Sequence, residues 1–248
     1  MTDEVEEAPV LVRHEGLLCR LILNHPARGN ALGPKMVSAL DAELTRAVEG
    51  GARLVVLQGA GRNLCTGFDL SGLEQMTDAT LLERFIRVEL LLQRIHGAAI
   101  VTMAVATGRT YGAGADLFAA CDRRIAVKGA RFAFPGSAFG LMLGIERLAA
   151  RIGQSAARAL LLDGGDIGAE EAVTLGLATA LVPAHDVGAL VPHALAAASR
   201  LDPATVATLH AATRPGTGDA ELATLVRSAS RPGLRERIMA YREATRVR

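Results

Sequence analysis

The chain has 248 residues, of which 50% are hydrophobic, 21% are charged and only 3% are aromatic, with no Trp. This length suits one large domain, or one domain with a helical appendage, and its core must be built mainly from aliphatic side chains. The formal net charge of +1 argues against a general binder of nucleic acids or membrane surfaces. No run approaches the roughly 18 apolar residues of a membrane span.

The cysteines and the N-terminus indicate the compartment. Cys19, Cys65 and Cys121 lie far apart and form no CxxC pair, which predicts buried free thiols. His, Cys and Asp residues do not gather at ligand spacing, so no metal site is expected. The acidic start, MTDEVEEAPV, lacks the basic and then apolar pattern of a signal peptide, and we expect a cytoplasmic protein.

The first part of the chain predicts alternating strands and helices. Residues 17–24 indicate a strand, and Pro26, Gly29 and the Gly33-Pro34 pair mark the loop that follows. Pro34 suits the first position of a helix over 34–50, and a short buried strand over 54–57 comes next. Such strand–helix–strand units predict parallel strands joined by right-handed crossovers.

Residues 79–96 predict a long amphipathic helix. Its apolar positions are Leu81, Leu82, Phe85, Ile86, Leu90 and Ile95. Its charged residues are expected to form a solvated face made of Glu83, Arg84, Arg87, Glu89 and Arg94.

The most informative stretch is 99–145. An apolar run over 99–106 predicts a buried strand, and Gly112-Ala113-Gly114-Ala115 then leads into a helix over 116–121. Small residues at this place allow another molecule to approach the backbone closely. Free amides and the dipole of a helix start polarise a carbonyl oxygen or hold an anion. The stretch is therefore a candidate site, followed by a second buried strand over 124–127.

The second half of the chain is predicted to be helical. The expected helices cover 145–153, 155–162, 169–175, 187–200, 203–213, 220–228 and 234–245. Residues 214–219, RPGTGD, are expected to be the most mobile connection between them.

Four motifs, in family order and spacing, resemble those of the enoyl-CoA hydratase/isomerase (crotonase) superfamily. The central run AVATGRTYGAGADLFAACDRRIAVKGARFAFP resembles AVNGxAxGGGxxLAxxCDxRIAxxxARFGxPE. NHPARGNAL at 24–32 resembles N-R/H-P-x-x-x-N-A-L, and LCTGFDL at 64–70 resembles F-x-A-G-x-D-L. LLLDGGDIGAEEAVTLGLATALVP at 160–183 resembles LLLTGxxxxAxEAxxxGLVxxVVP. The resemblance identifies the family and leaves the reaction open.

The resemblance implies an α/β fold of the crotonase (ClpP/crotonase-like) type, a spiral of ββα units with two roughly perpendicular parallel sheets. It implies a crotonase core over 1–190 that binds acyl-CoA. It also implies a C-terminal helical region over 191–248 that makes a homotrimer, or a hexamer built as a dimer of trimers.

The family polarises its thioester carbonyl with two backbone amides, an oxyanion hole. The resemblance assigns these donors to the N–H groups of Thr66, which precedes Gly67, and of Ala113, in the middle of Gly112-Ala113-Gly114. Removing one such donor typically costs about 3 kcal/mol of transition-state stabilisation. Asp69 is expected to cap or orient its loop.

Hydration in this family uses two glutamates, one to activate water for attack at C3 and one to protonate C2. The first position is Asp116 here, and the second, directly after the F-x-x-P proline, is Gly136. Asp withdraws the carboxylate by about 1.5 Å, and loss of a general acid or base costs about 10²–10⁴-fold. Efficient hydration is therefore not expected unless another group takes part.

The loop after Gly136 is shorter than in the family, which brings Glu146 toward the site. Glu146 is a candidate relocated base, although a partner of the helix dipole is the favoured interpretation. In the family the helix over 79–96 borders the acyl channel. Phe85 and Leu90 are therefore candidates for substrate contact, with core packing favoured for each.

The remaining predicted contacts to acyl-CoA come mainly from loops. Arg28 matches a position that is often basic near the nucleotide, with an ordinary exposed arginine as the alternative. The basic C-terminal helix either reaches the coenzyme A of a neighbouring subunit or is simply solvated. The other predicted binding residues are Gly67, Phe68, Asp69, Leu70, Tyr111, Gly112, Gly136 and Ser137.

We therefore predict an enoyl-CoA hydratase/isomerase family protein that acts on an acyl-CoA thioester, with Asp116 and Glu146 as catalytic candidates. The alternative is a non-catalytic acyl-CoA carrier of the same fold, because both glutamate positions are altered. No cofactor is expected beyond the coenzyme A of the substrate, and no nucleic-acid or membrane partner.

Overall fold

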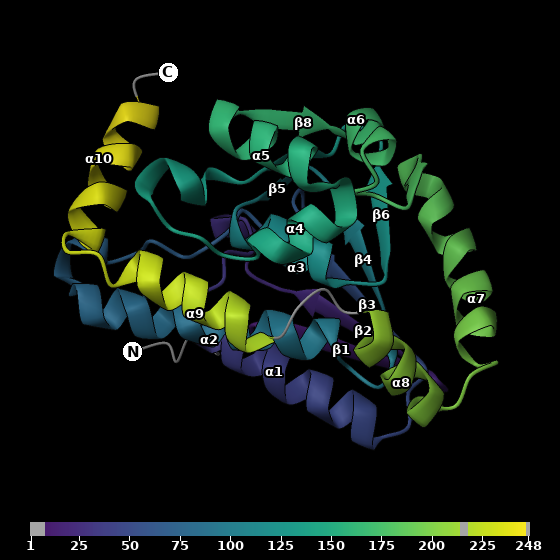
Figure 1. Cartoon of the computed structure of the whole chain (residues 1–248). Coiled ribbons are helices and arrows are strands. Elements are labelled where there is room, and N and C mark those ends of the chain that lie inside the picture. The colour runs from purple at the N-terminus through teal and green to yellow at the C-terminus, as the bar shows by residue number, and fades with distance from the viewer. Residues whose placement is uncertain (1–7, 214–217, 247–248) are drawn as a thin grey trace, which may run out of the picture.

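The computed structural model describes residues 8–213 and 218–246 (Figure 1). Its centre is a six-stranded sheet in the order β1-β2-β3-β4-β6-β9. These strands are β1 (Val10–Glu15), β2 (Leu18–Leu23), β3 (Leu54–Gly59), β4 (Val101–Ala106), β6 (Arg123–Val127) and β9 (Ala180–Val182). A three-stranded sheet contains β5 (Arg109–Tyr111), β7 (Arg131–Ala133) and β8 (Asp166–Gly168).

Both sheets are mixed rather than purely parallel. The pairs from β2 to β9 in the large sheet are parallel, as predicted, but β1 pairs with β2 antiparallel. In the small sheet, β5 and β7 are parallel and β7 and β8 are antiparallel. The tight turn at Gly16, whose φ is 61°, explains the first difference, because two strands joined by a hairpin must run antiparallel.

The predicted helices are confirmed, with ends shifted by a few residues. The first half holds α1 (Pro34–Glu49), α2 (Asp78–His96), α3 (Ala113–Ala120) and the short 3₁₀ segments η1 (Pro26–Arg28), η2 (Leu73–Gln75) and η3 (Pro135–Phe139). The second half holds α4 (Ile145–Ile152), α5 (Gln154–Asp163), α6 (Ala169–Thr174), η4 (Ala184–Asp186), α7 (Val187–Ala198), α8 (Pro203–Thr213), α9 (Gly218–Ala229) and α10 (Leu234–Arg246). Of the connection predicted at 214–219, residues 214–217 lie outside the described residues, and the last two begin α9.

The large sheet is buried on both faces. Along β3, Val55 and Leu57 point into the larger core with α1 and α2, whereas Leu54 and Val56 point into a smaller core with α7. Successive side chains of a strand point to opposite faces, so a continuous apolar run produces two buried faces. This is why the apolar stretches of the sequence predicted the inner strands correctly.

The C-terminal helices α9 and α10 pack on the core of the same chain. Figure 1 shows α9 beside α2, while α10 stands at the edge of the molecule away from α7 and α8. Leu225 of α9 and Leu234 and Ile238 of α10 are fully buried in the larger core. These two helices therefore help to build the region that holds η3 and the end of α2.

The predicted faces of α2 need correction. Glu89 is fully buried, because Arg147 of α4 donates hydrogen bonds of 2.9 and 2.6 Å to its two carboxylate oxygens. Arg147 also pairs with Glu221 of α9. Leu90, predicted to be apolar and buried, is 43% exposed. The buried residues of the helix are 81, 85, 88, 89, 91, 92 and 95.

Two further properties concern the whole fold. All three cysteines are buried and free, as predicted, and burial raises the pKa of the Cys65 thiol to about 12. Such a thiol is unreactive at neutral pH. Among the helices of residues 8–213 and 218–246, none is long and apolar enough to cross a membrane.

Candidate active site

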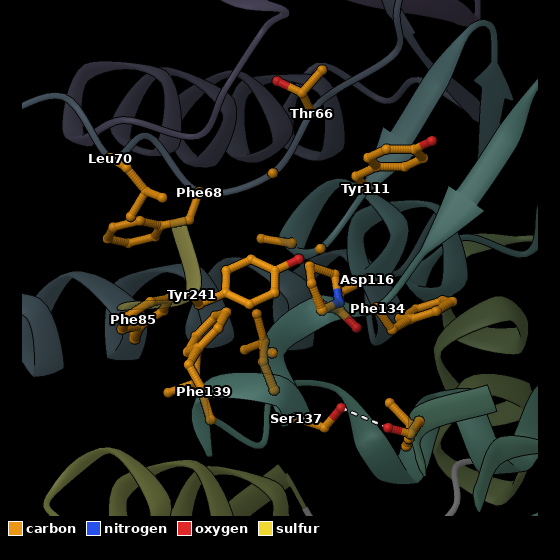
Figure 2. A pocket seen from close by; sticks show the side chains of 18 of the residues that line it. Thr66, Phe68, Leu70, Phe85, Tyr111, Asp116, Phe134, Ser137, Phe139 and Tyr241 are labelled. Carbon is orange, nitrogen blue, oxygen red and sulfur yellow. Dashed lines mark hydrogen bonds between the residues drawn. The ribbon is translucent and has the colours of Figure 1, made fainter. Parts of the chain in front are cut away.

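A cavity of about 240 Å³ lies where the loop at 65–70, the start of α3, η3 and α10 meet (Figure 2). Although aromatic residues are scarce in this chain, which has six Phe and two Tyr, four of the Phe and both Tyr line the cavity. They are Phe68, Phe85, Tyr111, Phe134, Phe139 and Tyr241. Phe68 and Phe85 stack with their ring centroids 4.1 Å apart, which makes one wall flat and apolar. This lining suits an apolar group with little room for water.

Backbone geometry places α3 at the cavity. β4 ends at Ala106 and the short β5 brings the chain to Gly112, whose φ of 51° favours glycine. The Gly112 N–H donates to the Ala133 carbonyl oxygen of β7 at 2.8 Å, which fixes the turn before the helix. All eight residues of α3 are buried, so the start of this helix is rigid.

A buried asparagine fixes the loop that leads to the second backbone segment of the site. Asn30 has a φ of 58°, and its side-chain amide donates to the carbonyl oxygens of Ala60 and Asn63 at 2.9 and 2.8 Å. Its Oδ1 atom accepts from the His25 N–H at 2.9 Å. The family-like motif NHPARGNAL therefore ties η1 to the turn before the loop at 65–70.

The predicted amide donor Thr66 does not fit the structure. Its N–H already donates to the Gly29 carbonyl oxygen at 2.9 Å. Phe68 offers an amide instead, because Leu32 bonds to the residues on either side of Phe68 and not to Phe68 itself. The Leu32 N–H donates to the Gly67 carbonyl oxygen, and the Leu32 carbonyl oxygen accepts from the Asp69 N–H. Amides alternate in direction along an extended strand, so the Phe68 N–H points away from Leu32.

Two unengaged amides therefore converge at the cavity. Within the described residues, neither the Phe68 N–H nor the Ala113 N–H has a hydrogen-bond acceptor. The two segments touch at Gly67, whose φ is 109°: a Cβ built there would lie 2.8 Å from the Tyr111 carbonyl oxygen and 3.7 Å from the Ala113 nitrogen. Only glycine allows this approach. Of the two amides that the sequence predicts as donors, that of Ala113 is unengaged and that of Thr66 is not, and the second unengaged amide lies two residues after Thr66.

Asp116 lies one turn into α3, lines the cavity and is 4% exposed. Its Oδ1 atom is buried without a hydrogen-bond partner among the described residues. Burial raises the pKa of this carboxyl well above its usual range; nearby Arg147 opposes the rise, while Glu89 and Glu221 add to it. A buried, unpaired carboxyl with a raised pKa is the arrangement expected of a group that transfers protons.

A glycine of the shortened loop makes room for this acid. Gly144 has a φ of 64°, and a Cβ built on it would lie 2.5 Å from the Asp116 Oδ1 atom. Glu146, two residues later, is partly exposed in the first turn of α4 and is not part of the cavity lining. The structure thus brings the shortened loop to the site through Gly144 and not through the carboxylate of Glu146.

The second glutamate position is closed to any side chain. A Cβ built on Gly136 would lie 2.9 Å from the Leu141 carbonyl oxygen, and the Leu141 N–H donates to the Gly136 oxygen at 2.9 Å. The turn in η3 is therefore folded around glycine. Restoring the family glutamate at this position requires the loop to shift.

The other hydroxyl groups predicted at the site are engaged elsewhere. Ser137 donates to the Leu161 carbonyl oxygen at 2.8 Å, which Figure 2 shows as a dashed line. The Tyr111 hydroxyl donates to the Asp166 Oδ2 atom at 2.6 Å. Both residues line the cavity, as predicted, but their hydroxyl groups are bonded to oxygen atoms of the protein.

The sequence missed Tyr241 as a lining residue, and Phe134, Phe139, Leu141 and Leu143 with it. Tyr241 comes from the last helix, and no local pattern links that helix to the centre of the chain. Of the two candidate substrate contacts on α2, Phe85 lines the cavity and Leu90 does not.

A polar mouth adjoins the cavity. A hollow of about 350 Å³ is lined by Arg28, Asp69, Ser71 and Arg242, and it shares Phe68 and Leu70 with the cavity. Asp69 accepts from the Ser71 N–H at 2.9 Å and hydroxyl at 2.5 Å. Although its partial burial acts to raise the pKa of this carboxyl, the Ser71 hydrogen bonds and Arg28 lower it overall. Asp69 therefore orients the loop, as predicted, and Arg28 and Arg242 supply positive charge.

Comparison with known proteins identifies the family. Residues 13–230 match the family model described as enoyl-CoA hydratase/isomerase. A protein of Rhodobacter capsulatus named "Probable enoyl-CoA hydratase" is 37% identical over 177 residues, which cover 69% of this chain and 67% of that protein. A "Probable enoyl-CoA hydratase" of Mycobacterium bovis is 34% identical over 189 residues, covering 72% and 76%.

Solved structures agree. A crystal structure from Bordetella parapertussis, described as an enoyl-CoA hydratase/isomerase, superposes with a TM-score of 0.91 at 39% identity and covers 94% of this chain and 98% of that chain. An enoyl-CoA hydratase from Bacillus halodurans superposes with a TM-score of 0.82 at 22% identity, over 94% and 99% of the chains, and supports the fold alone. The fold is that of the crotonases. The chain belongs to the enoyl-CoA hydratase/isomerase family.

Proposed function

We propose that the cavity binds the acyl group of an acyl-CoA thioester and that the protein catalyses a hydratase- or isomerase-type reaction at C2 and C3 of that group. One observation carries the proposal: two unengaged amides, from Phe68 and Ala113, converge in an apolar cavity beside the buried acid Asp116. Amides so placed stabilise the negative charge that develops on a thioester oxygen during such reactions.

The parts of the site divide the work. The amides hold the thioester oxygen, and Asp116, with its raised pKa, is a base suited to accept a proton from water or from carbon. The aromatic walls exclude bulk water, which strengthens every electrostatic interaction inside. At the mouth, Arg28 and Arg242 are suited to the phosphates of coenzyme A. No cofactor beyond the coenzyme A of the substrate is part of this proposal.

Two expectations from the family resemblance complete the proposal. We expect a homotrimer or a hexamer in a cytoplasmic setting. The core over 1–190 and the helical region over 191–248 remain the proposed division of the chain.

The proposal is tested with crotonyl-CoA. Hydration is followed as loss of the absorbance of the conjugated thioester, and the affinity for butyryl-CoA is measured on the same sample. A matched thioether, S-butyl-CoA, lacks the carbonyl oxygen and therefore cannot use the two amides. We expect turnover, and tighter binding of the thioester than of the thioether. Equal affinities for the two ligands contradict the oxyanion hole, and binding without turnover of any enoyl-CoA leaves the carrier alternative.

A further inference from the structure

Hydration of a double bond needs two proton transfers, and the described site has one carboxylate. Adding water across C2 and C3 removes a proton from water and delivers a proton to C2. Asp116 is suited to only one of these at a time, and Gly136 has no side chain. The second proton must therefore come from another group in the cavity or from solvent.

The hydrogen bonds of the cavity leave one hydroxyl for this task. Polar side chains of the lining belong to Thr66, Tyr111, Asp116, Ser137 and Tyr241. The hydroxyls of Thr66, Tyr111 and Ser137 donate to an oxygen of the protein. The Tyr241 hydroxyl has no hydrogen-bond partner within residues 8–213 and 218–246, and burial raises its pKa above the usual value, which keeps it a proton donor.

Figure 2 shows how this hydroxyl lies. The Tyr241 ring reaches into the cavity, with its oxygen directed toward the side where Asp116 and Phe134 lie. The ring packs on Phe139 of η3, with the ring centroids 5.4 Å apart. η3 also contains Gly136, so the tyrosine enters the cavity over the segment from which the family glutamate would extend.

Tyr241 is held in place by anchors at the start of its helix. The Asp78 carboxylate accepts from the N–H groups of Gly233, Leu234 and Arg235 at 2.9, 3.1 and 2.8 Å, which caps α10 from the first turn of α2. Arg237 donates to the Phe139 carbonyl oxygen at 2.9 Å. These bonds tie α10 to both walls of the cavity.

We propose that Tyr241 is the second catalytic residue of this site, whose hydroxyl donates the proton to C2 while Asp116 accepts the proton of the attacking water. This inference rests on the proposed function. The water oxygen bonds to C3 as one of its O–H bonds breaks and that proton passes to the Asp116 carboxylate. The C2–C3 π electrons shift toward the thioester oxygen and give an enolate that is held in the oxyanion hole. C2 of the enolate then bonds to the phenol proton as the Tyr241 O–H bond breaks. The protonated Asp116 carboxyl finally gives one proton to the Tyr241 phenolate, which restores both groups.

The test is Tyr241→Phe, which removes only the oxygen and keeps the ring on Phe139. We expect kcat for crotonyl-CoA hydration to fall by about 10²-fold or more, while KM and the affinity for butyryl-CoA stay within a factor of about three. Thr245→Val is the control, because it removes a hydroxyl from the same helix outside the cavity. It should retain wild-type kinetics.

Chemical rescue separates proton transfer from packing. In Tyr241→Ala, added phenol should restore part of the lost turnover, whereas toluene, which fills the same space without a hydroxyl, should not. Tyr241→Phe with more than a third of wild-type kcat overturns the inference, as does equal rescue by toluene and phenol. If the wild type turns over no acyl-CoA, the proposed function fails and this inference fails with it. Full loss in Asp116→Asn combined with an active Tyr241→Phe overturns this inference alone.

Discussion

Two groups of buried acids lie within electrostatic reach of each other and are built in opposite ways. Glu89 and Glu221 share Arg147, so each carboxylate has a charged partner and three helices are joined. Asp116 is buried to a similar extent, yet its Oδ1 atom has no hydrogen-bond partner among the described residues. Burying a charge is costly unless it is paired. The paired acids join three helices, whereas the unpaired acid is the group that we propose to transfer protons.

The comparison explains how one arginine serves two purposes. Arg147 lowers the cost of burying Glu89 and Glu221, and its charge also opposes the rise in the pKa of Asp116. The two glutamates act on Asp116 in the other direction. The paired cluster therefore contributes to the proton affinity of Asp116, to which it makes no hydrogen bond.

The largest effect is expected when the paired group is broken. Arg147→Met keeps the length of the side chain but leaves two buried carboxylates without a cation. We expect the free energy of unfolding to fall by about 3–5 kcal/mol, measured by urea denaturation. Arg94→Met, which removes an exposed pair with Asp41, is the control and should cost less than about 1 kcal/mol. Equal losses in the two variants would show that the buried cluster has no special role.

The second effect concerns the space around the unpaired acid. Gly144→Ala puts a Cβ 2.5 Å from the Asp116 Oδ1 atom, which is closer than the atoms can approach, and should displace the carboxyl by about 1 Å and lower kcat by about 10²-fold. Gly129→Ala is matched in backbone strain, because its φ is 87° with no atom within 4 Å of the added Cβ. It should lose stability without the loss of kcat. Similar kinetics in the two variants would remove Asp116 from the reaction.

The third effect is a pH dependence. Hydration needs the carboxylate form of Asp116, whose pKa is raised by burial. Below this raised pKa, kcat should therefore fall about tenfold per pH unit. A kcat that stays flat down to the ordinary pKa of an aspartate, about 3.9, would contradict a buried base. The pH profile of kcat is measured with crotonyl-CoA under saturating conditions. Asp69→Asn is the control and should leave the fall in kcat at low pH in place.

The sequence predicted the parts of the molecule that depend on local order. Apolar runs gave the inner strands, and helical spacing gave the helices, because each pattern reports burial along a single element. The motif around Gly112–Asp116 placed the start of α3 and the acid in the cavity, since these residues follow one another in the chain. The glycine at 67 and the amide of Ala113 are brought together by the fold that these motifs define.

The errors share one cause, which is contact between distant segments. Glu89 was predicted to be solvated because its charged partner, Arg147, lies 58 residues away in the sequence. Tyr241 was missed for the same reason. Thr66 was chosen from its place in a motif, although only the hydrogen bond to Gly29 shows that its amide is occupied. Local patterns carry no information about such pairings.

The central claim is that Asp116 costs stability and supplies activity, and Asp116→Asn tests both at once. The folded protein raises the pKa of this group, so it binds more protons than the unfolded chain between the unfolded value, about 3.9, and the folded value. The stability of the wild type therefore falls by about 1.4 kcal/mol per pH unit across this window as the pH rises. Above the folded pKa the stability stays at this lower value.

The measurement is thermal unfolding and crotonyl-CoA turnover of the wild type and Asp116→Asn, at pH 4 and at pH 8. The account predicts equal melting temperatures for the two proteins at pH 4, a higher one for Asp116→Asn at pH 8, and loss of turnover by about 10²-fold or more in that variant. A variant that is less stable than the wild type at pH 8, or that still turns over substrate at the wild-type rate, would contradict it.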